Sequence, residues 1–179
     1  FQSASKFLNS LQCKNVISII GNHDKRSIEA IEYFRRYINN INCILPMAVD
    51  KCTKKNLILD QLPPDIGDNF TDLNFIQKIT IGDKSLLIVC LDTSEIFQDN
   101  GFIDLEMLRS VSNQIANETF DKIILLNHHS ILETDYDPLF NSSSIIEFVR
   151  QHKIEHVFCG HTHKLALMKS TDLYHQHIF

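Results

Sequence analysis

The chain has 179 residues, of which 44% are apolar and 22% are charged, with 12 Phe, 5 Gly and no Trp. This length predicts one domain with a hydrophobic core, and the composition excludes a disordered or collagen-like chain. The net charge of -5 at pH 7, without a block of Lys or Arg, argues against a dedicated nucleic-acid-binding protein.

Five cysteines are scattered along the chain without a C-x-x-C pair. Their odd number and wide spacing favour reduced thiols in the protein core over a disulfide framework, which is typical of a cytoplasmic compartment. No apolar run approaches the ~20 residues that span a bilayer, and the N-terminus lacks a charged region followed by an apolar one. We therefore expect a cytoplasmic protein that does not bind membranes.

The N-terminal half of the chain begins with a helix and then a strand. Apolar residues at helical spacing predict an amphipathic helix over Ser3–Leu11, and the apolar run that follows predicts a strand over Val16–Ile20. A second helix is predicted over Ser27–Asn39, with Ser27 as its cap. Prolines and charged residues in Asn40–Gly67 indicate short strands and a long surface connection.

The rest of the chain continues the alternation of helices and strands. Two strands over Phe75–Ile81 and Ser85–Leu91 are predicted to form a hairpin around Gly82-Asp83-Lys84. The elements expected after the hairpin are a helix over Asp104–Ala116, a strand over Lys122–Leu126, a helix over Ser143–Gln151, a strand over Ile154–Cys159, and edge strands over Leu165–Met168 and Leu173–Phe179. No repeat or linker interrupts them, so we expect residues 1–179 to form a single domain.

Metal-ligand side chains follow three of the predicted strands. The ligand-type residues in these three clusters are Asn22 and His23, then His128 and His129, then His161 and His163. Because open α/β sheets place their binding crevices at the carboxyl ends of their strands, the three clusters can meet at one site. A single histidine in such a place is more often structural, and Gly21 and Gly160 are also explained as turn residues. The coincidence of all three clusters favours the site.

The residue types indicate which ion this site would bind. Neutral imidazoles and an amide oxygen suit a divalent transition-metal ion. His161 and His163 would point to the same side of an extended segment, whereas in a tight turn they would diverge toward two neighbouring ions. His23 adjoins Asn22, so it is better placed to donate a proton or to stabilise an anion than to bind the same ion.

The blocks GNHD, NHHS and GHTH, in this order and each after a strand, resemble the last three signature blocks of the calcineurin-like metallophosphoesterases. The segment LLIVCLDTSEIFQDNGFIDLEMLRSVSNQI also resembles that family, in which a strand ends in Leu-Asp-Thr/Ser and a Gly precedes a helix. Each block alone would be a weak signal. Together, in this order and at these separations, the blocks and this segment form a strong signal that extends over most of the chain.

The resemblance implies a four-layer αββα sandwich and a two-metal centre that hydrolyses phosphate esters through a metal-bound hydroxide. The implied cofactors are two divalent transition-metal ions, which would be Mn, Fe, Zn, Co or Ni. Asn22, His128 and His161 would bind one ion and His163 the other. His23 would steady the transition state and assist the leaving oxygen, and the substrate would be a small phosphate ester.

The neighbours of these residues receive structural roles. His128, as the first histidine after its strand, is favoured over His129 as the ligand. Asp24 is interpreted as the cap of the next helix rather than as a partner that orients His23. Lys25 and Arg26 are interpreted as a solvated helix start rather than as phosphate contacts.

The family's first two blocks, Asp-x-His and Gly-Asp-x-x-Asp/Asn, are not found in this sequence. These blocks supply carboxylate ligands, so we expect a domain truncated at both ends, with an exposed sheet edge that invites pairing with another chain. The alternative to an enzyme is a non-catalytic scaffold or interaction module. The expected specificity loops are Asn40–Thr71, Glu95–Gly101 and Glu133–Asn141. The excess of acidic over basic residues in the first of these loops favours a small phosphodiester or nucleotide over a long polyanion.

Overall fold

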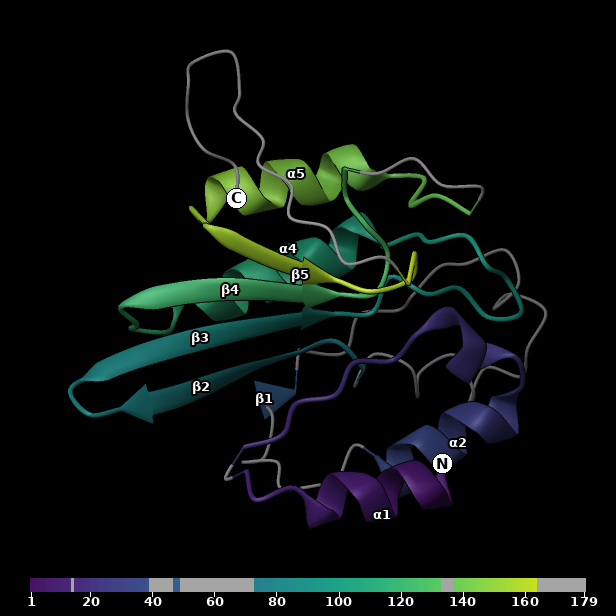
Figure 1. The fold of residues 1–179 in the computed structure, drawn as a ribbon. Helices are drawn as coiled ribbons and strands as arrows, with labels where there is room; N and C mark the ends of the chain where they lie inside the picture. Colours follow the sequence, from purple (N-terminus) through teal and green to yellow (C-terminus); the bar gives the residue numbers. More distant parts are fainter. Residues whose placement is uncertain (14, 39–46, 49–72, 133–136, 164–179) are drawn as a thin grey trace.

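The centre of the protein is a five-stranded sheet in the order β1-β2-β3-β4-β5 (Figure 1). In the computed structural model, residues 1–13, 15–38, 47–48, 73–132 and 137–163 are described. The strands are β1 (Met47–Ala48), β2 (Phe75–Ile81), β3 (Lys84–Leu91), β4 (Lys122–Asn127) and β5 (His156–Cys159). Strands β1, β2 and β3 pair in antiparallel fashion, whereas β3, β4 and β5 run parallel. The carboxyl ends of the three parallel strands therefore lie at the same end of the sheet.

The hairpin predicted from the sequence is confirmed. Strands β2 and β3 pair from Phe75 opposite Cys90 to Ile81 opposite Lys84. Gly82 in the turn has a φ of 63°, in the left-handed region that glycine adopts without steric cost. The predicted edge strands over 165–168 and 173–179, and all of the predicted connection over 40–67 except β1, lie outside the described residues.

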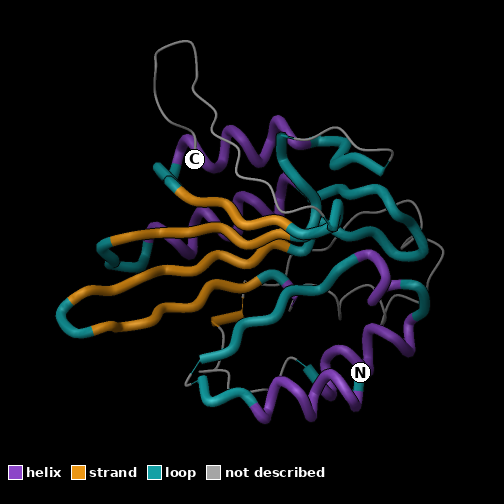
Figure 2. The backbone as a smooth tube through the Cα atoms, in the orientation of Figure 1, coloured by secondary structure: helices purple, strands orange, loops and turns teal. Residues whose placement is uncertain are grey.

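Helices of the described residues lie on both sides of the sheet, as Figures 1 and 2 show. Helices α4 (Leu105–Ala116) and α5 (Ser142–Gln151) lie on one side, and α1 (Gln2–Ser10) and α2 (Ile28–Tyr37) lie on the other. Both ends of each helix lie within two residues of the bounds predicted from the apolar spacing. The Ser27 side chain accepts a hydrogen bond of 3.0 Å from the Ala30 N–H, so the predicted cap of α2 is confirmed.

The sheet contributes to a different apolar cluster on each of its faces. On one face, residues such as Leu87, Val89 and Leu125 pack with buried side chains of α4 and α5. On the other face, Phe75, Ile88 and Cys90 form a second cluster. This alternation follows from the period of two in a strand, whose successive side chains point to opposite faces.

The predicted strand over Val16–Ile20 is wrong as a hydrogen-bonded strand. Residues 15–20 have no strand assignment, and no described strand pairs with them. Ile17 and Ile19 pack against the apolar cluster of the sheet, whereas Val16 and Ile20 join the cluster that includes side chains of α2. The apolar alternation therefore reports packing on two sides, which does not require a partner strand.

These clusters define the order of the layers. Helices α4 and α5 cover one face of the sheet, and the segment 15–20 lies between the other face and the helices α1 and α2. This mixed α/β arrangement confirms the predicted fold class, the αββα sandwich. In the described part, an extended segment without strand pairing, residues 15–20, occupies the position of the second β-layer.

The expectation of core thiols has a mixed outcome. Cys90 is fully buried as expected, but Cys13 and Cys159 are exposed, so the prediction of core thiols is wrong for these two residues. Cys43 and Cys52 lie outside the described residues. No described helix has the length and apolar character that crossing a bilayer requires.

Candidate metal centre

The three ligand-bearing blocks meet at the carboxyl ends of the parallel strands. The Asn22 Oδ1 atom lies 2.8 Å from the Nε2 atom of His128. The Nδ1 atom of His161 lies 3.2 Å from the same Nε2 atom. Three of the four predicted ligands are thus brought together from η1 (Asn22–Lys25) and from the segments that follow β4 and β5.

The donor atoms at this point fit a transition-metal ion. Ring nitrogens of His128, His129 and His161 all lie within 4.8 Å of one another. With the Asn22 oxygen beside them, the nitrogens of His128 and His161 form a nitrogen-rich donor set with one neutral oxygen, which suits ions such as Mn, Fe, Co, Ni or Zn. The described residues add no carboxylate to this group of ligand atoms.

Backbone geometry sets the positions of His128 and His161. A Cβ atom on Gly21 would lie 2.8 Å from the Cε1 atom of His128, so the imidazole occupies the space that the glycine leaves free. The Gly160 N–H donates a hydrogen bond of 2.9 Å to the His128 carbonyl, which ties the segment after β5 to the end of β4. His161 and His163 have φ values of 63° and 55°, so the segment forms the tight turn rather than the extended alternative.

His129 has a different role from His128. Its Nε2 atom lies 2.8 Å from the Asp99 carbonyl, which can only accept, so Nε2 carries the proton. Its Nδ1 atom then accepts from the Thr93 hydroxyl at 3.0 Å, and that hydroxyl accepts from the His129 N–H at 3.2 Å. Both ring nitrogens are therefore engaged, which supports the preference for His128 as the ligand.

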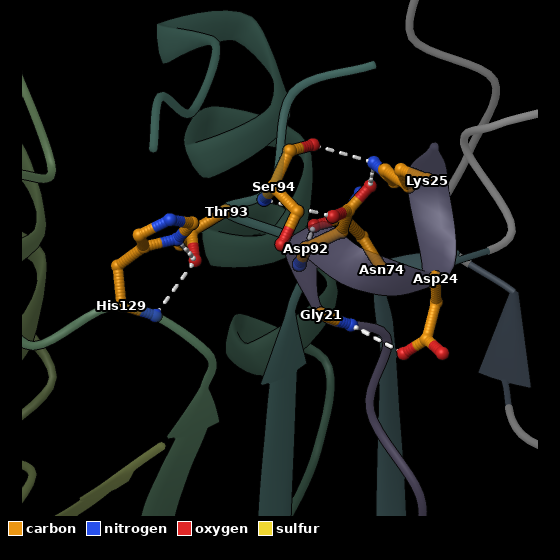
Figure 3. A network of polar contacts seen from close by, with 8 residues as sticks. All are labelled: Gly21, Asp24, Lys25, Asn74, Asp92, Thr93, Ser94 and His129. Carbon is orange, nitrogen blue, oxygen red and sulfur yellow. Dashed lines mark hydrogen bonds and ion pairs between the residues drawn. The ribbon is translucent and has the colours of Figure 1, made fainter. Parts of the chain in front are cut away.

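Lys25 lies in the interior, and its interpretation as part of a solvated helix start is wrong. Its side chain is 1% exposed and forms an ion pair with Asp92, which is also buried (Figure 3). Its ammonium group donates a second hydrogen bond of 2.6 Å to the Ser94 carbonyl. Asp92 in turn accepts from the Ser94 N–H, and its own N–H donates to Asn74. The ion pair between Lys25 and Asp92 therefore links η1 to the segment that follows β3.

Asp24 closes its own turn rather than capping α2. Its carboxylate accepts a hydrogen bond of 3.0 Å from the Gly21 N–H, as Figure 3 shows, whereas Ser27 caps α2. Burial raises the pKa of Asp24, and the hydrogen bond from Gly21 opposes that effect. The turn that carries Asn22 and His23 is thus closed from within.

Asp99 reaches the same region from the loop after β3. Its carboxylate accepts a hydrogen bond of 2.7 Å from the Asn22 amide nitrogen and forms an ion pair with Arg26. The hydrogen bond from Asn22 and the charge of Arg26 lower the pKa of Asp99. Arg26 is exposed, as expected for a residue at the start of a helix.

The remaining two predicted site residues lie outside the cluster of ligand atoms. His23 belongs to η1 and is exposed. His163 is also exposed, at the last described position of the chain's C-terminal part. Within the described residues, neither ring belongs to the group of ligand atoms around His128.

Burial controls the charge of the central imidazole. The pKa of His128 is lowered from 6.5 to about 4, chiefly because the ring is removed from water. The charges that His129, His161 and His23 can carry lower it further, whereas Asp92 opposes the shift. His128 is therefore neutral at pH 7, which is the form that binds a metal ion.

The chain matches the calcineurin-like phosphoesterase family over residues 1–165, and it belongs to that family. The family's description is that of phosphoesterases, which hydrolyse phosphate esters. A hypothetical protein from Thermus thermophilus is among the matching solved structures, with 19% identity and a TM-score of 0.38. The match covers 55% of this chain and 34% of that protein, so the chain spans about a third of its length. No curated protein matches the sequence.

Sequence reasoning missed the residues that hold the ligands in place. Lys25, Asp92, Thr93 and Asp99 belong to this group. The signal for two of them was present, because Asp92 and Thr93 end the strand segment Leu-Asp-Thr that resembles the family. An uninterrupted run of polar residues directly after an apolar strand, Asp92 to Glu95, indicates a buried polar network at the strand end.

Replacing Gly21 by Ala is expected to displace the His128 ring, because the new Cβ would lie 2.8 Å from Cε1. Metal affinity should fall at least about tenfold, since ligand orientation controls it. Gly160→Ala is the matched control, because its Cβ would meet His128 only at an ordinary 3.5 Å. Calorimetric titration with Mn²⁺ measures both variants, and equal losses in the two would contradict the steric argument.

Replacing Lys25 by Met is expected to destabilise the fold by about 3–5 kcal/mol, because the Asp92 carboxylate stays buried while its ammonium partner is removed. Lys84→Met is the matched control, since Lys84 is 69% exposed and pairs with Asp121 at 3.3 Å. That variant should change stability by less than about 1 kcal/mol. Urea unfolding measures both, and a Lys25→Met variant as stable as the wild type would contradict the role of the pair.

The metal-free protein is expected to lose stability as the pH falls from 7 toward 4. The unfolded chain protonates His128 near pH 6.5, whereas the folded chain does so only near pH 4. The contribution of the neutral ring to the free energy of unfolding is therefore complete above pH 6.5. It is lost as the pH falls through the pKa of the folded state. The ring is only half-buried, so about 1–2 kcal/mol is expected rather than the ~3 kcal/mol of the full shift.

This pH effect is measured by urea unfolding in the presence of chelator at about pH 7 and at about pH 4.5. Most of the expected loss of stability falls between these two pH values. His129 and His152, whose pKa values burial also lowers, contribute in the same direction. His128→Gln removes the ring that titrates, so its stability should depend less on pH than that of the wild type. An equal pH dependence in both proteins would contradict the assignment to His128.

Proposed function

We propose that the protein containing this chain hydrolyses a phosphate monoester or diester with two divalent transition-metal ions. The observation that carries the proposal is the convergence of Asn22 and His161 on the Nε2 atom of His128. Three separate sequence blocks supply these atoms. A scaffold without catalytic activity would gain nothing from placing them together, which favours the enzyme over the interaction module.

Asn22, His128 and His161 would hold one ion, and His163 would contribute to the second. When bound, the ions would supply Lewis acidity to a phosphate oxygen and lower the pKa of a water molecule. The turn that carries His161 and His163 supports this division, because their left-handed backbone lets neighbouring side chains diverge. His161 lies against His128, while His163 is exposed to solvent.

His23 would act on the substrate rather than on the metal. It follows Asn22 in the same turn, and its exposed ring can reach a bound phosphate ester. A protonated ring nitrogen there would stabilise the developing charge and donate its proton to the leaving oxygen. Asp24 supports this position indirectly, since it closes the turn through the Gly21 N–H.

The preferred substrate is a small phosphodiester or nucleotide rather than a nucleic acid. The net charge of -5 does not favour a long polyanion. Of the predicted specificity loops, Glu95–Gly101 contacts the candidate centre, because Asp99 bonds to both Asn22 and His129. The cellular location we expect is the cytoplasm, and pairing with another chain would use an edge of the sheet.

The proposal is tested by measuring metal content and hydrolysis together. The protein containing this chain is loaded with Mn²⁺, desalted and analysed by elemental mass spectrometry, and bis(p-nitrophenyl) phosphate and p-nitrophenyl phosphate are assayed with and without chelator. Asn22→Ala and His161→Ala should lower metal content and turnover together. His23→Ala should lower turnover by about 10²–10⁴-fold while the metal stays bound.

His156→Ala is the control for these variants, because His156 is an exposed histidine at the start of β5. It should change neither metal content nor turnover. Hydrolysis that persists in excess chelator would contradict the metal-dependent mechanism. Metal binding without hydrolysis of either ester would favour the interaction module.

A further inference from the structure

The amide of Asn22 is held at both ends. Its side chain is almost fully buried, with 3% of the residue exposed. The amide nitrogen donates to the Asp99 carboxylate at 2.7 Å, and the amide oxygen lies 2.8 Å from the His128 Nε2 atom. The two contacts come from segments far from Asn22 in the sequence.

An amide side chain can present either of two faces to a metal site. Its oxygen is a ligand, whereas its NH₂ group is a donor with no lone pair for a metal ion. An ionised carboxylate can only accept hydrogen bonds, so the NH₂ group must face Asp99 and the oxygen must face His128. We propose that Asp99 is a positioning residue that fixes the Asn22 amide with its oxygen toward His128. The effect of this positioning on metal affinity rests on the proposed function.

Several contacts hold Asp99 in place independently of its carboxylate. Its carbonyl accepts from the His129 Nε2 atom at 2.8 Å, and His129 itself is 1% exposed. Earlier in the loop, the Phe97 N–H donates to the Lys25 carbonyl at 3.0 Å. The loop therefore follows η1, and the backbone of residue 99 would stay in position if its side chain were shortened.

Arg26 completes the arrangement. It donates to the same Asp99 carboxylate that receives the Asn22 amide. Arg26 lies at the end of η1, so the carboxylate joins two points of the turn that carries Asn22 and His23. The charge of Arg26 also favours the ionised carboxylate, which is the form that cannot donate to Asn22.

The geometry does not favour Asp99 as a metal ligand. Within the described residues, the group of ligand atoms that lie within 4.8 Å of one another contains only His128, His129 and His161. Asp99 reaches this group through Asn22 and through its own backbone carbonyl. Its side chain is 38% exposed and turned toward Arg26. The carboxylate therefore acts on the metal site through the amide that it holds.

Two variants of Asp99 separate its possible roles. Asp99→Ala removes the acceptor, whereas Asp99→Asn keeps an oxygen that can accept from the Asn22 amide. The first readout needs no metal: it is the side-chain amide resonance of Asn22 in ¹⁵N correlation spectra, assigned by its loss in Asn22→Ala. The second readout is the dissociation constant for Co²⁺, measured by calorimetric titration.

We expect Asp99→Ala to shift the Asn22 amide resonance and to weaken Co²⁺ binding about 10–100-fold, as loss of a group that orients a ligand does. Asp99→Asn should stay within about fivefold of the wild type. Asp121→Ala is the matched control, because Asp121 is an exposed carboxylate that accepts from Ser85 and Lys84. It should leave both readouts unchanged.

The outcomes distinguish this inference from the proposed function. An Asn22 resonance that is unchanged in Asp99→Ala overturns the inference, whether or not metal binds. Equal Co²⁺ affinity in Asp99→Ala and the wild type also overturns it. A wild-type chain that binds no Co²⁺ contradicts the proposed metal centre instead, and the amide resonance then still decides whether Asp99 holds Asn22.

Discussion

The buried ion pair between Lys25 and Asp92 is the contact on which the geometry of the centre depends. It joins the turn that carries Asn22 to the segment that follows β3, and both side chains are almost completely removed from water. The ammonium also binds the Ser94 carbonyl, so a second bond fixes its position. Buried ion pairs add little net stability, but removing one partner is costly. The pair therefore specifies one arrangement of η1 over the strand ends.

From Asp92 the network continues across the parallel strands to the candidate ligands. The next residue, Thr93, bonds to both the ring and the backbone of His129, and the other ring nitrogen of His129 bonds to the carbonyl of Asp99. His129 thus connects the end of β4 to the loop that reaches Asn22. The residues that would bind the metal are few, and the residues that hold them are polar groups hydrogen-bonded to one another. Such networks define a single geometry, because each member restricts the next.

Most of the fold could be predicted from the sequence because its signals are local. The helices and the hairpin follow from apolar spacing within a few residues, and the blocks that carry Asn22, His128 and His161 are short and contiguous. The prediction of a strand over Val16–Ile20 is wrong because a strand requires a partner, whereas apolar alternation shows only that both sides are packed.

The supporting residues could not be predicted because their partners are distant in the sequence. Lys25 and Asp92 lie 67 positions apart, and Asn22 and Asp99 lie 77 positions apart. A lysine at the start of a helix is usually solvated, and nothing near Lys25 in the sequence indicates that a carboxylate lies in the interior. Gly101 gives a similar example, since its need for glycine arises from the His129 ring, to which a Cβ would lie only 2.7 Å away.

The turn after β5 has a consequence for the order in which the protein folds. Two residues with side chains, His161 and His163, adopt left-handed backbone angles, each of which costs on the order of 1 kcal/mol. A hydrogen bond from Gly160 to the His128 carbonyl ties this turn to β4. Because its local backbone preference is unfavourable, we expect this turn to form late and to open first in local unfolding. The candidate ligand His161 would thus reach its position last, after β4 and η1 have placed His128 and Asn22.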